Sequence, residues 1–167
     1  MEYIEAKNKF IQTWGALGSQ WGINKTMAQI HALLMVSSTP ISMEEVMDEL
    51  QISRGNASMN LRALMDWGIV YKEYKAGERR DYFTAEQDLD ELALKIAKER
   101  SKREIKPALK ILKEVSSIKN NNSDESTQFI NQTKKLYDFV LKADNMIEKV
   151  TEFKDNWLGR LVIKIMK

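Results

Sequence analysis

The chain has no cysteine, one histidine and two prolines among its 167 residues, and it has no long apolar run. Without cysteine there is no disulfide and no thiolate zinc site, and the single imidazole of His31 is too little for a histidine-based metal centre. No run approaches the ~20 apolar residues that a membrane-spanning helix needs, and the charged N-terminus is unlike a secretory signal. We therefore expect a cytoplasmic protein with no membrane association, metal or cofactor.

An excess of positive charge is also missing, since the net charge is only +2. Residues 1–87 hold nine Lys/Arg against eleven Asp/Glu, and residues 88–167 hold seventeen against thirteen. A globally basic surface is therefore not available as an argument for nucleic-acid binding. Any such affinity has to come from a few cations placed locally.

Motifs for catalysis are absent from the sequence as well. There is no nucleophile with a base at a known motif spacing and no glycine-rich phosphate loop. His31 lies beside Ile30 and Leu33 in a predicted helix, where packing or facing solvent is a plainer role than catalysis. The sequence predicts a protein that is not an enzyme.

The most informative stretch runs from Ile41 to Tyr82. Ser42 followed three residues later by Glu45 is a capping box, which predicts a helix from Met43 to Leu50. A short turn follows, and Ser53 is the expected N-cap of a second helix that reaches Trp67. Gly68 follows the last periodic residue and suits the left-handed position after a helix.

Two strands are predicted directly after this pair of helices. Residues 69–74 are rich in β-branched and aromatic side chains, residues 75–80 form a charged turn with one glycine, and residues 81–85 form the return strand. Two helices joined by a tight turn and followed by a basic hairpin make a winged helix-turn-helix. That layout places its second helix in the major groove of DNA.

The remaining sequence is expected to be helical. Apolar spacings of three, four and seven predict helices over residues 3–17, 25–36, 88–118 and 125–150, with Pro107 interrupting the third. The predicted fold class is mainly α with a small β-hairpin wing, a winged helix-turn-helix followed by a long-helix dimerisation region. We expect a DNA-binding domain at 1–87 and a helical dimerisation and effector region at 88–167. The amphipathic tail from Phe153 to Met166 suits packing against a partner subunit, with a membrane-surface role as the alternative.

A helical wheel separates the two faces of the second helix. Ala57, Leu61 and Leu64 share one face and are expected to pack on the first helix. The outward N-terminal half offers side chains that can bond base edges or phosphates, or lie against a thymine methyl. The predicted DNA-contacting residues are Ser53, Arg54, Gly55, Asn56, Ser58, Met59 and Arg62, together with Arg79 and Arg80 of the wing.

Each of these residues also has a plainer interpretation. Asn and Ser near a helix start often serve as caps, and Arg62 could pair with Asp66 one turn later. Arg79 or Arg80 could pair with Glu78 or Asp81, which in a solvated turn stabilises by only ~0–1 kcal/mol.

The run from Ile52 to Val70, followed by Gly77 to Phe83, resembles the GbsR branch of the MarR-type transcriptional regulators. The segments Phe10 to Gly15 and Trp21 to Asn24 are similar to that branch too, so the resemblance covers about residues 8–90. It implies a homodimeric repressor or activator whose two winged helices address the half-sites of a palindromic operator. Some members respond to choline or related osmolytes, so the resemblance also implies a small-molecule effector, for which the sequence assigns no residue.

Two hypotheses for function remain open at this stage. The first is a dimeric, sequence-specific regulator that binds double-stranded DNA. The second is a protein-interaction module that uses a winged-helix scaffold without binding DNA, and the acidic balance of residues 1–87 keeps this alternative open.

Overall fold

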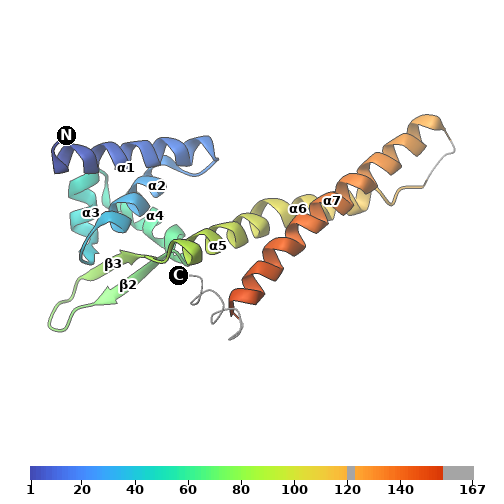
Figure 1. Cartoon of the computed structure of the whole chain (residues 1–167). Coiled ribbons are helices and arrows are strands. Elements are labelled where there is room, and N and C mark those ends of the chain that lie inside the picture. Colours follow the sequence, from blue (N-terminus) through green and yellow to red (C-terminus); the bar gives the residue numbers. More distant parts are fainter. Residues whose placement is uncertain (120–122, 156–167) are drawn as a thin grey trace. The chain divides into compact units, whose positions relative to one another are not determined.

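The computed structural model describes residues 1–119 and 123–155. In chain order the elements are α1 (Tyr3–Gln20), α2 (Lys25–Val36), β1 (Ile41–Ser42), α3 (Met43–Leu50), α4 (Arg54–Asp66), β2 (Val70–Tyr74), β3 (Asp81–Ala85), α5 (Leu89–Arg100), the π-helix η1 (Ser101–Ile105), α6 (Lys106–Val115) and α7 (Asp124–Asp155) (Figure 1). This order confirms the predicted mainly α fold with a winged helix-turn-helix followed by long helices, whereas dimerisation through those helices stays a prediction. The predicted amphipathic tail lies mostly outside the described residues.

Contacts between residues divide the chain into two compact units, Met1–Lys95 and Ile96–Lys167. The sequence instead placed a functional division between residues 87 and 88. That division concerns DNA binding and dimerisation rather than packing, and it stays a prediction. Among the described residues no helix is long and apolar enough to cross a membrane.

The helix-turn-helix of the first unit forms from local signals. The Ser42 hydroxyl accepts the backbone N–H of Glu45 at 3.2 Å, and the Glu45 carboxylate accepts the Ser42 N–H at 2.6 Å, which is the predicted capping box. The turn is made by Gln51, whose φ of 52° is left-handed, and Ser53 caps α4. Gly68 has φ 69°, as predicted for the position after a helix.

Two glycines allow α1 to approach α2 closely. A Cβ at Gly18 would lie 2.5 Å from the Cβ of Ala28, and one at Gly15 would lie 2.5 Å from Cγ of Gln29. Such separations are far inside van der Waals contact, so the two helices could not keep this distance with larger residues. The sequence predicted a helix over residues 3–17, and the structure extends α1 to Gln20 and shows that two of its glycines set its packing on α2.

The wing belongs to a three-stranded antiparallel sheet in the order β1-β3-β2. The predicted hairpin pairs Val70 with Ala85 at one end and Tyr74 with Asp81 at the other. The third strand, β1, pairs Ile41 with Phe83 and was not predicted. A strand of two residues has no periodicity to detect, and its pairing partner lies some forty residues further along the chain.

The core of the first unit is built by α2, α3, α4 and the sheet. Its fully buried side chains are Ile30, Leu33, Leu34, Val46, Leu61, Leu64 and Val70. His31 is buried among them, and its Nε2 atom has no hydrogen-bond partner among the residues that the structure describes. Burial lowers the pKa of His31 to about 4. This histidine is therefore a neutral core residue, so of the two roles expected from the sequence, packing and facing solvent, the structure shows packing.

In the second unit the predicted long helix is divided into three segments. η1 separates α5 from α6, and Pro107 is the second residue of α6. Proline has no backbone N–H, and its ring crowds the carbonyl four residues earlier, so a wider turn just before Pro107 accommodates both effects. α6 ends at Val115, three residues before the predicted end, and α7 packs against α6 and η1.

Candidate nucleic-acid interface

α4 presents its two faces as the helical wheel predicted. Ala57, Leu61 and Leu64 are buried, whereas Met59 is 60% exposed and Arg62 is exposed. The wheel did not predict that Asn60 would be buried as well. The outward side of α4 is therefore exposed enough to lie in a groove of DNA.

Arg62 is the least constrained cation on α4. It makes no ion pair or hydrogen bond with any residue in the described ranges 1–119 and 123–155, and the considered pair with Asp66 does not form there. Gly55 lies in the first turn, where a Cβ would meet nothing within 4 Å. Both residues stand on the exposed side, and the half-buried Ser58 lies at its flank. Among the residues that the structure describes, nothing competes with a ligand for this part of α4.

Other predicted contact residues already have structural roles. The Ser53 hydroxyl accepts the backbone N–H of Asn56 at 3.3 Å, which is the N-cap. Arg54 pairs with Glu44 of α3 at 2.6 Å. A backbone hydrogen bond and then Arg54 lower the pKa of the Glu44 carboxyl. Because this pair is exposed, it holds Arg54 weakly, and a phosphate could displace the carboxylate.

The side chain of Asn56 is oriented by the buried Asn60. The Asn60 Nδ2 group donates to the backbone carbonyl of Asn56 at 2.9 Å and to its Oδ1 at 2.6 Å. The amide NH₂ of Asn56 is then turned away from Asn60. An amide held in this way has one free lone pair and two donors with which to meet a base edge.

The wing tip exposes both of its arginines. Residues 71–80 are all exposed, and Gly77 has the left-handed φ of 83° that the turn requires. The two carboxylates considered as partners for Arg79 and Arg80 are bound elsewhere. Glu78 accepts a hydrogen bond from the hydroxyl of Tyr82, and Asp81 pairs with Lys72 of β2 at 2.9 Å.

Lys75 has a different role in the wing. Its ammonium group lies 3.7 Å from the ring centroid of Tyr82, which is a cation–π contact. Arg79 and Arg80, by contrast, have no ion pair within the described ranges 1–119 and 123–155. The wing therefore offers two adjacent cations, which suit a phosphate backbone or a narrow minor groove.

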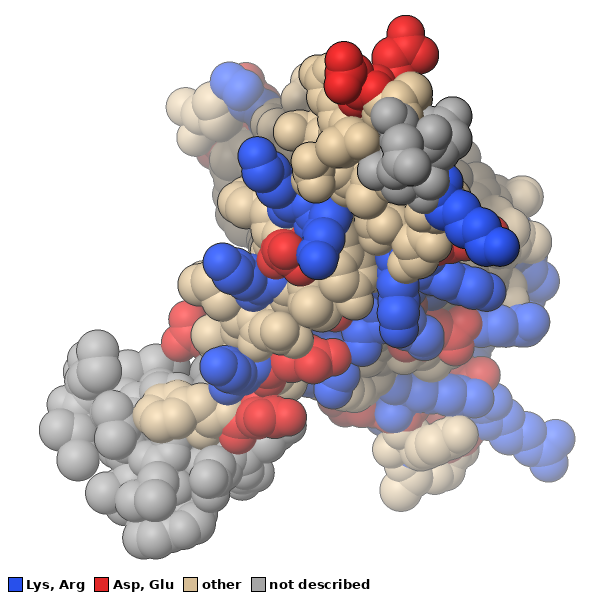
Figure 2. Space-filling view, turned by 90° about the vertical axis from the view of Figure 1, so that its right-hand side faces the viewer, with Lys and Arg blue, Asp and Glu red and all other residues tan. Residues whose placement is uncertain are grey.

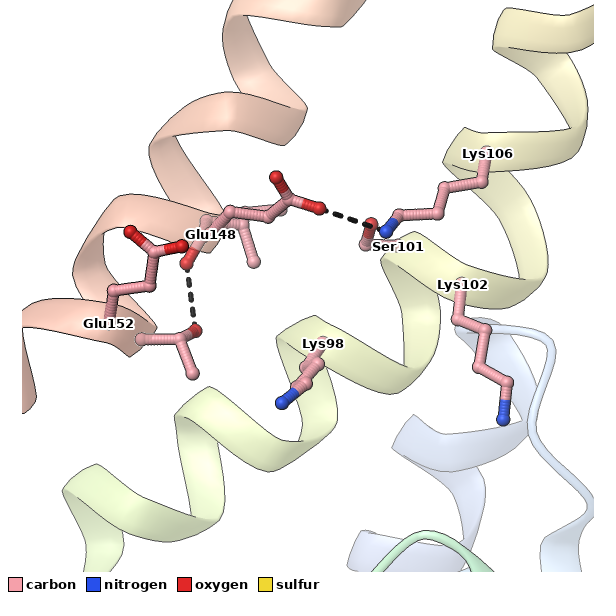
Figure 3. Close-up of a pocket in the computed structure, with 8 residues that line it drawn as sticks. Lys98, Ser101, Lys102, Lys106, Glu148 and Glu152 are labelled. Atoms are coloured by element: carbon pink, nitrogen blue, oxygen red, sulfur yellow. Dashed lines mark hydrogen bonds and ion pairs between the residues drawn. The ribbon is translucent and has the colours of Figure 1, made fainter. Parts of the chain in front are cut away.

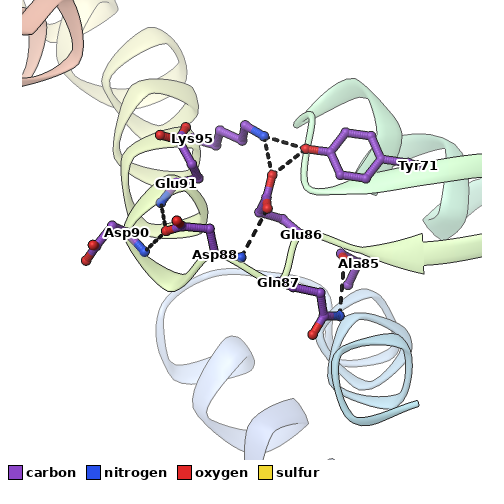
Figure 4. Close-up of polar contacts among 8 residues, drawn as sticks. All are labelled: Tyr71, Ala85, Glu86, Gln87, Asp88, Asp90, Glu91 and Lys95. Atoms are coloured by element: carbon purple, nitrogen blue, oxygen red, sulfur yellow. Dashed lines mark hydrogen bonds and ion pairs between the residues drawn. The ribbon is translucent and has the colours of Figure 1, made fainter. Parts of the chain in front are cut away.

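A polar cluster at the base of the wing joins it to the start of α5 (Figure 4). Tyr71 donates to Glu86 at 2.5 Å, and Lys95 donates to Glu86 at 2.6 Å and also to the Tyr71 hydroxyl. Burial alone would raise the pKa of Glu86, but the hydrogen bonds from Lys95 and Tyr71 outweigh it and bring the value to about 2. Sequence analysis missed this cluster, because its members lie fifteen and nine residues apart and match no motif.

The second unit contains a hollow of about 360 Å³ beside η1. Lys98, Lys102 and Lys106 line one wall, Glu148 and Glu152 line the other, and Figure 3 shows Lys106 paired across the hollow with Glu148 at 2.9 Å. At its floor the buried Ser101 hydroxyl donates to the buried Asp144 carboxylate. The hollow is large enough for a small molecule with charged groups.

Charges elsewhere on the surface are mixed. On the face that Figure 2 shows, Lys and Arg side chains are interspersed with Asp and Glu rather than collected in one continuous patch. This distribution agrees with the small net charge of the sequence. Recognition of a polyanion would therefore depend on the outward side of α4 and on the wing tip.

Comparison with known proteins gives a family for part of the chain. Residues 21–81 match the sequence model of the MarR family, a stretch that runs from the end of α1 to the first residue of β3. This part of the winged helix is therefore similar to the MarR family. No curated protein matches the chain.

Several solved structures are similar to this chain. A transcriptional regulator with 18% identity superposes with a TM-score of 0.58 over 86% of this chain and 99% of its own, and this likeness shows a shared fold. A MepR mutant from S. aureus bound to an oligodeoxyribonucleotide has 17% identity and a TM-score of 0.42 over 82% of this chain and 94% of its own. A MarR transcriptional regulator from Methanosarcina mazei Go1 has 19% identity and a TM-score of 0.40 over 84% and 94%.

Proposed function

We propose that this protein is a sequence-specific transcriptional regulator that binds double-stranded DNA as a homodimer and is not an enzyme. The observation that carries the proposal is the exposed side of α4, where Gly55, Met59 and Arg62 have no competing partner within the described ranges 1–119 and 123–155. The two unpaired arginines of the wing support it, as does the similarity of residues 21–81 to the MarR family.

In this proposal α4 enters the major groove with its N-terminal half. Arg62 is suited to the O6 and N7 atoms of a guanine, Asn56 to the edge of an adenine, and Met59 to a thymine methyl. Ser53, Arg54 and Ser58 are placed to bond phosphates near the helix N-terminus, whose dipole attracts anions.

The wing completes the contact. Arg79 or Arg80 reaches the DNA backbone or the adjacent minor groove, where arginine is favoured by the negative potential. Two copies of the unit then address the half-sites of a palindromic operator, about one helical turn apart. Such a protein acts in the cytoplasm.

The effector forms a further part of the proposal. The resemblance to the GbsR branch implies a small-molecule effector, and the hollow beside η1 offers space and opposite charges for one. An effector bound there would change DNA affinity only if it binds the DNA-binding conformation and the inactive conformation with different affinities.

The alternative is a winged helix that binds a protein instead of DNA. The acidic balance of residues 1–87 favours the protein-binding alternative. DNA binding is favoured by Arg62, Arg79 and Arg80, which make no ion pair within the described ranges 1–119 and 123–155. The salt dependence of binding separates the DNA-binding and protein-binding hypotheses, because neutralisation of phosphates makes DNA affinity fall steeply as the salt concentration rises.

The test begins with operators selected from a genomic duplex library by the full-length protein. Fluorescence anisotropy should then show tight binding to the selected duplex and weak binding to a scrambled one. Arg62→Ala should weaken operator binding by about ten- to a hundredfold and relax the base preference at one position in each half-site. Lys134→Ala on α7, an exposed cation outside the interface, is the matched control. Equal binding of operator and scrambled DNA by the parent and the Arg62 variant would refute the groove assignment.

A further inference from the structure

The first turn of α3 carries two acidic residues with different partners. Glu45 belongs to the capping box, because its carboxylate accepts the backbone N–H of Ser42 at 2.6 Å and the Ser42 hydroxyl at 2.7 Å. Glu44, the preceding residue, lies outside this pair of bonds. Its carboxylate accepts a hydrogen bond from the guanidinium group of Arg54 at 2.6 Å. The capping box therefore explains Glu45 and does not explain Glu44.

Arg54 differs from the other arginines proposed to contact DNA. Arg62, Arg79 and Arg80 make no ion pair within the part of the chain that the structure describes, whereas the charge of Arg54 is offset by Glu44. Arg54 is the first residue of α4, where the helix dipole attracts anions, and its side chain is 61% exposed. A cation placed to bind a phosphate thus already holds a carboxylate.

Glu44 also lies close enough to the wing to be affected by its charge. A backbone hydrogen bond and the hydrogen bond from Arg54 lower the pKa of Glu44, and the charge of Arg80 lowers it further. Arg80 belongs to the wing tip and Arg54 to α4. One carboxylate therefore interacts with a cation from each of the two elements proposed to contact DNA.

A carboxylate and a phosphate compete for the same guanidinium group, since both accept paired N–H bonds from arginine. Arg54 can bind a DNA phosphate only by releasing Glu44, whose negative charge then stays beside the DNA and repels it. Phosphate contacts carry no sequence information, and they supply essentially all of the non-specific affinity for DNA. The pair of Glu44 and Arg54 therefore opposes DNA binding in a way that does not depend on base sequence.

We propose that Glu44 is an intramolecular competitor of DNA phosphate, which holds Arg54 in the free protein and limits the sequence-independent part of the affinity for DNA. This inference rests on the proposed function and adds to it a residue that opposes binding. Arg62, which is proposed to bond a base, has no such competitor among the described residues. Glu44 therefore weakens a phosphate contact and leaves base recognition unchanged.

Glu44→Gln tests this competition directly. The substitution keeps the size of the side chain and removes its charge, and the fold should be retained because the pair is exposed. The full-length variant should bind the selected operator and a scrambled duplex more tightly than the parent, by a similar factor of about two- to fivefold for each copy of the chain on DNA. The slope of the logarithm of the association constant against the logarithm of salt concentration should become steeper by about one per copy.

Two further variants separate competition from a general change of charge. Glu49→Gln removes the same charge near the C-terminal end of α3, where Glu49 pairs with Lys7 at 3.1 Å, and it should leave both affinities unchanged. Arg54→Ala should weaken binding to both duplexes. Adding Glu44→Gln to Arg54→Ala should then recover little affinity, because the cation that Glu44 holds has been removed.

Three results would overturn the inference: unchanged or weaker DNA binding by Glu44→Gln, an equal gain from Glu49→Gln, or a gain from Glu44→Gln that persists in full without Arg54. A gain confined to the selected operator would also contradict it, since Glu44 would then act on base recognition. If the parent prefers no selected duplex, yet Glu44→Gln binds all duplexes more tightly at low salt, the proposed function fails and this inference stands. If neither protein binds any duplex at low salt, both fail.

Discussion

The buried Asn60 donates two hydrogen bonds to Asn56, at 2.9 Å to the backbone carbonyl and 2.6 Å to Oδ1. Asn60 faces the core, whereas Asn56 lies at the edge of the surface proposed to enter the groove. A core residue thereby fixes the orientation of a residue expected to bond a base. Such support limits the side-chain entropy that Asn56 loses on binding.

Asn60→Ala should therefore affect both stability and recognition. Loss of two partly buried hydrogen bonds should lower the free energy of unfolding by about 1–2 kcal/mol in urea titrations. Operator affinity should also fall in a binding titration, with the preference relaxed at the base that Asn56 contacts. Asn8→Ala, on the exposed side of α1, should change neither quantity. Unchanged specificity in the Asn60 variant would show that Asn56 does not depend on this support.

Gly55→Ala should separate folding from DNA binding. Gly55 lies in α4 with open space where a Cβ would be, so alanine should raise the free energy of unfolding by about 0.5–1 kcal/mol. The added methyl group should nevertheless weaken operator binding, because it would stand between the helix backbone and the DNA.

Gly18→Ala provides the contrast. Its Cβ would lie 2.5 Å from that of Ala28, so the substitution should destabilise the fold by about 1–3 kcal/mol in thermal or urea unfolding. A Gly55 variant that is more stable and binds the operator as tightly as the parent would refute a close approach of DNA at this position.

The wing arginines should contribute to affinity through phosphate or minor-groove contacts. We expect at least one of Arg79→Ala and Arg80→Ala to remove a phosphate contact. That variant should reduce the slope of the logarithm of the DNA association constant against the logarithm of salt concentration by about one per contact in each half-site. Lys9→Ala, an exposed cation on α1, should leave the slope unchanged. If both single variants keep the parent slope, the wing does not neutralise a phosphate.

Glu86 should make stability depend on acid pH. Its pKa in the folded protein is about 2, against an ordinary value of 4.5, because Lys95 and Tyr71 stabilise the carboxylate. A carboxyl group whose pKa is lower in the folded than in the unfolded protein contributes fully to the free energy of unfolding above the unfolded-state pKa. For Glu86 this contribution is lost as the pH falls from about 4.5 towards 2. Glu86→Gln should be less stable than the parent by on the order of 2 kcal/mol at pH 7, and the difference should shrink below pH 4.5.

Urea unfolding at several pH values measures this effect. Glu73→Gln, which removes an exposed carboxylate on β2, is the matched control. A constant difference between Glu86→Gln and the parent from pH 7 to pH 3 would contradict the prediction.

Features that depend on neighbours within one turn were predictable from the sequence. The capping box of Ser42 and Glu45, the cap at Ser53 and the left-handed Gly68 each involve residues close in the chain, so their types are enough to predict the geometry. The same holds for the outward side of α4, because helical periodicity fixes which residues share a face.

Features that join distant residues were not predictable. β1 depends on pairing with Phe83, the burial of Asn60 depends on what packs over α4, and η1 replaces a simple proline interruption. The plainer pairing of a wing arginine with Glu78 or Asp81 is not found because Tyr82 and Lys72 take those carboxylates.

By itself, then, the sequence determined the winged helix-turn-helix and the row of side chains that α4 turns outward, since both follow from short-range periodicity and caps. Only the tertiary structure decided which of those side chains are free, because Glu44 of α3, ten residues away in the chain, binds Arg54, and because the buried Asn60 directs its amide onto Asn56 one helical turn earlier. The tertiary structure also decided which side of α7 packs against α6 and η1, since a periodic pattern gives the direction of a face but not what packs on it.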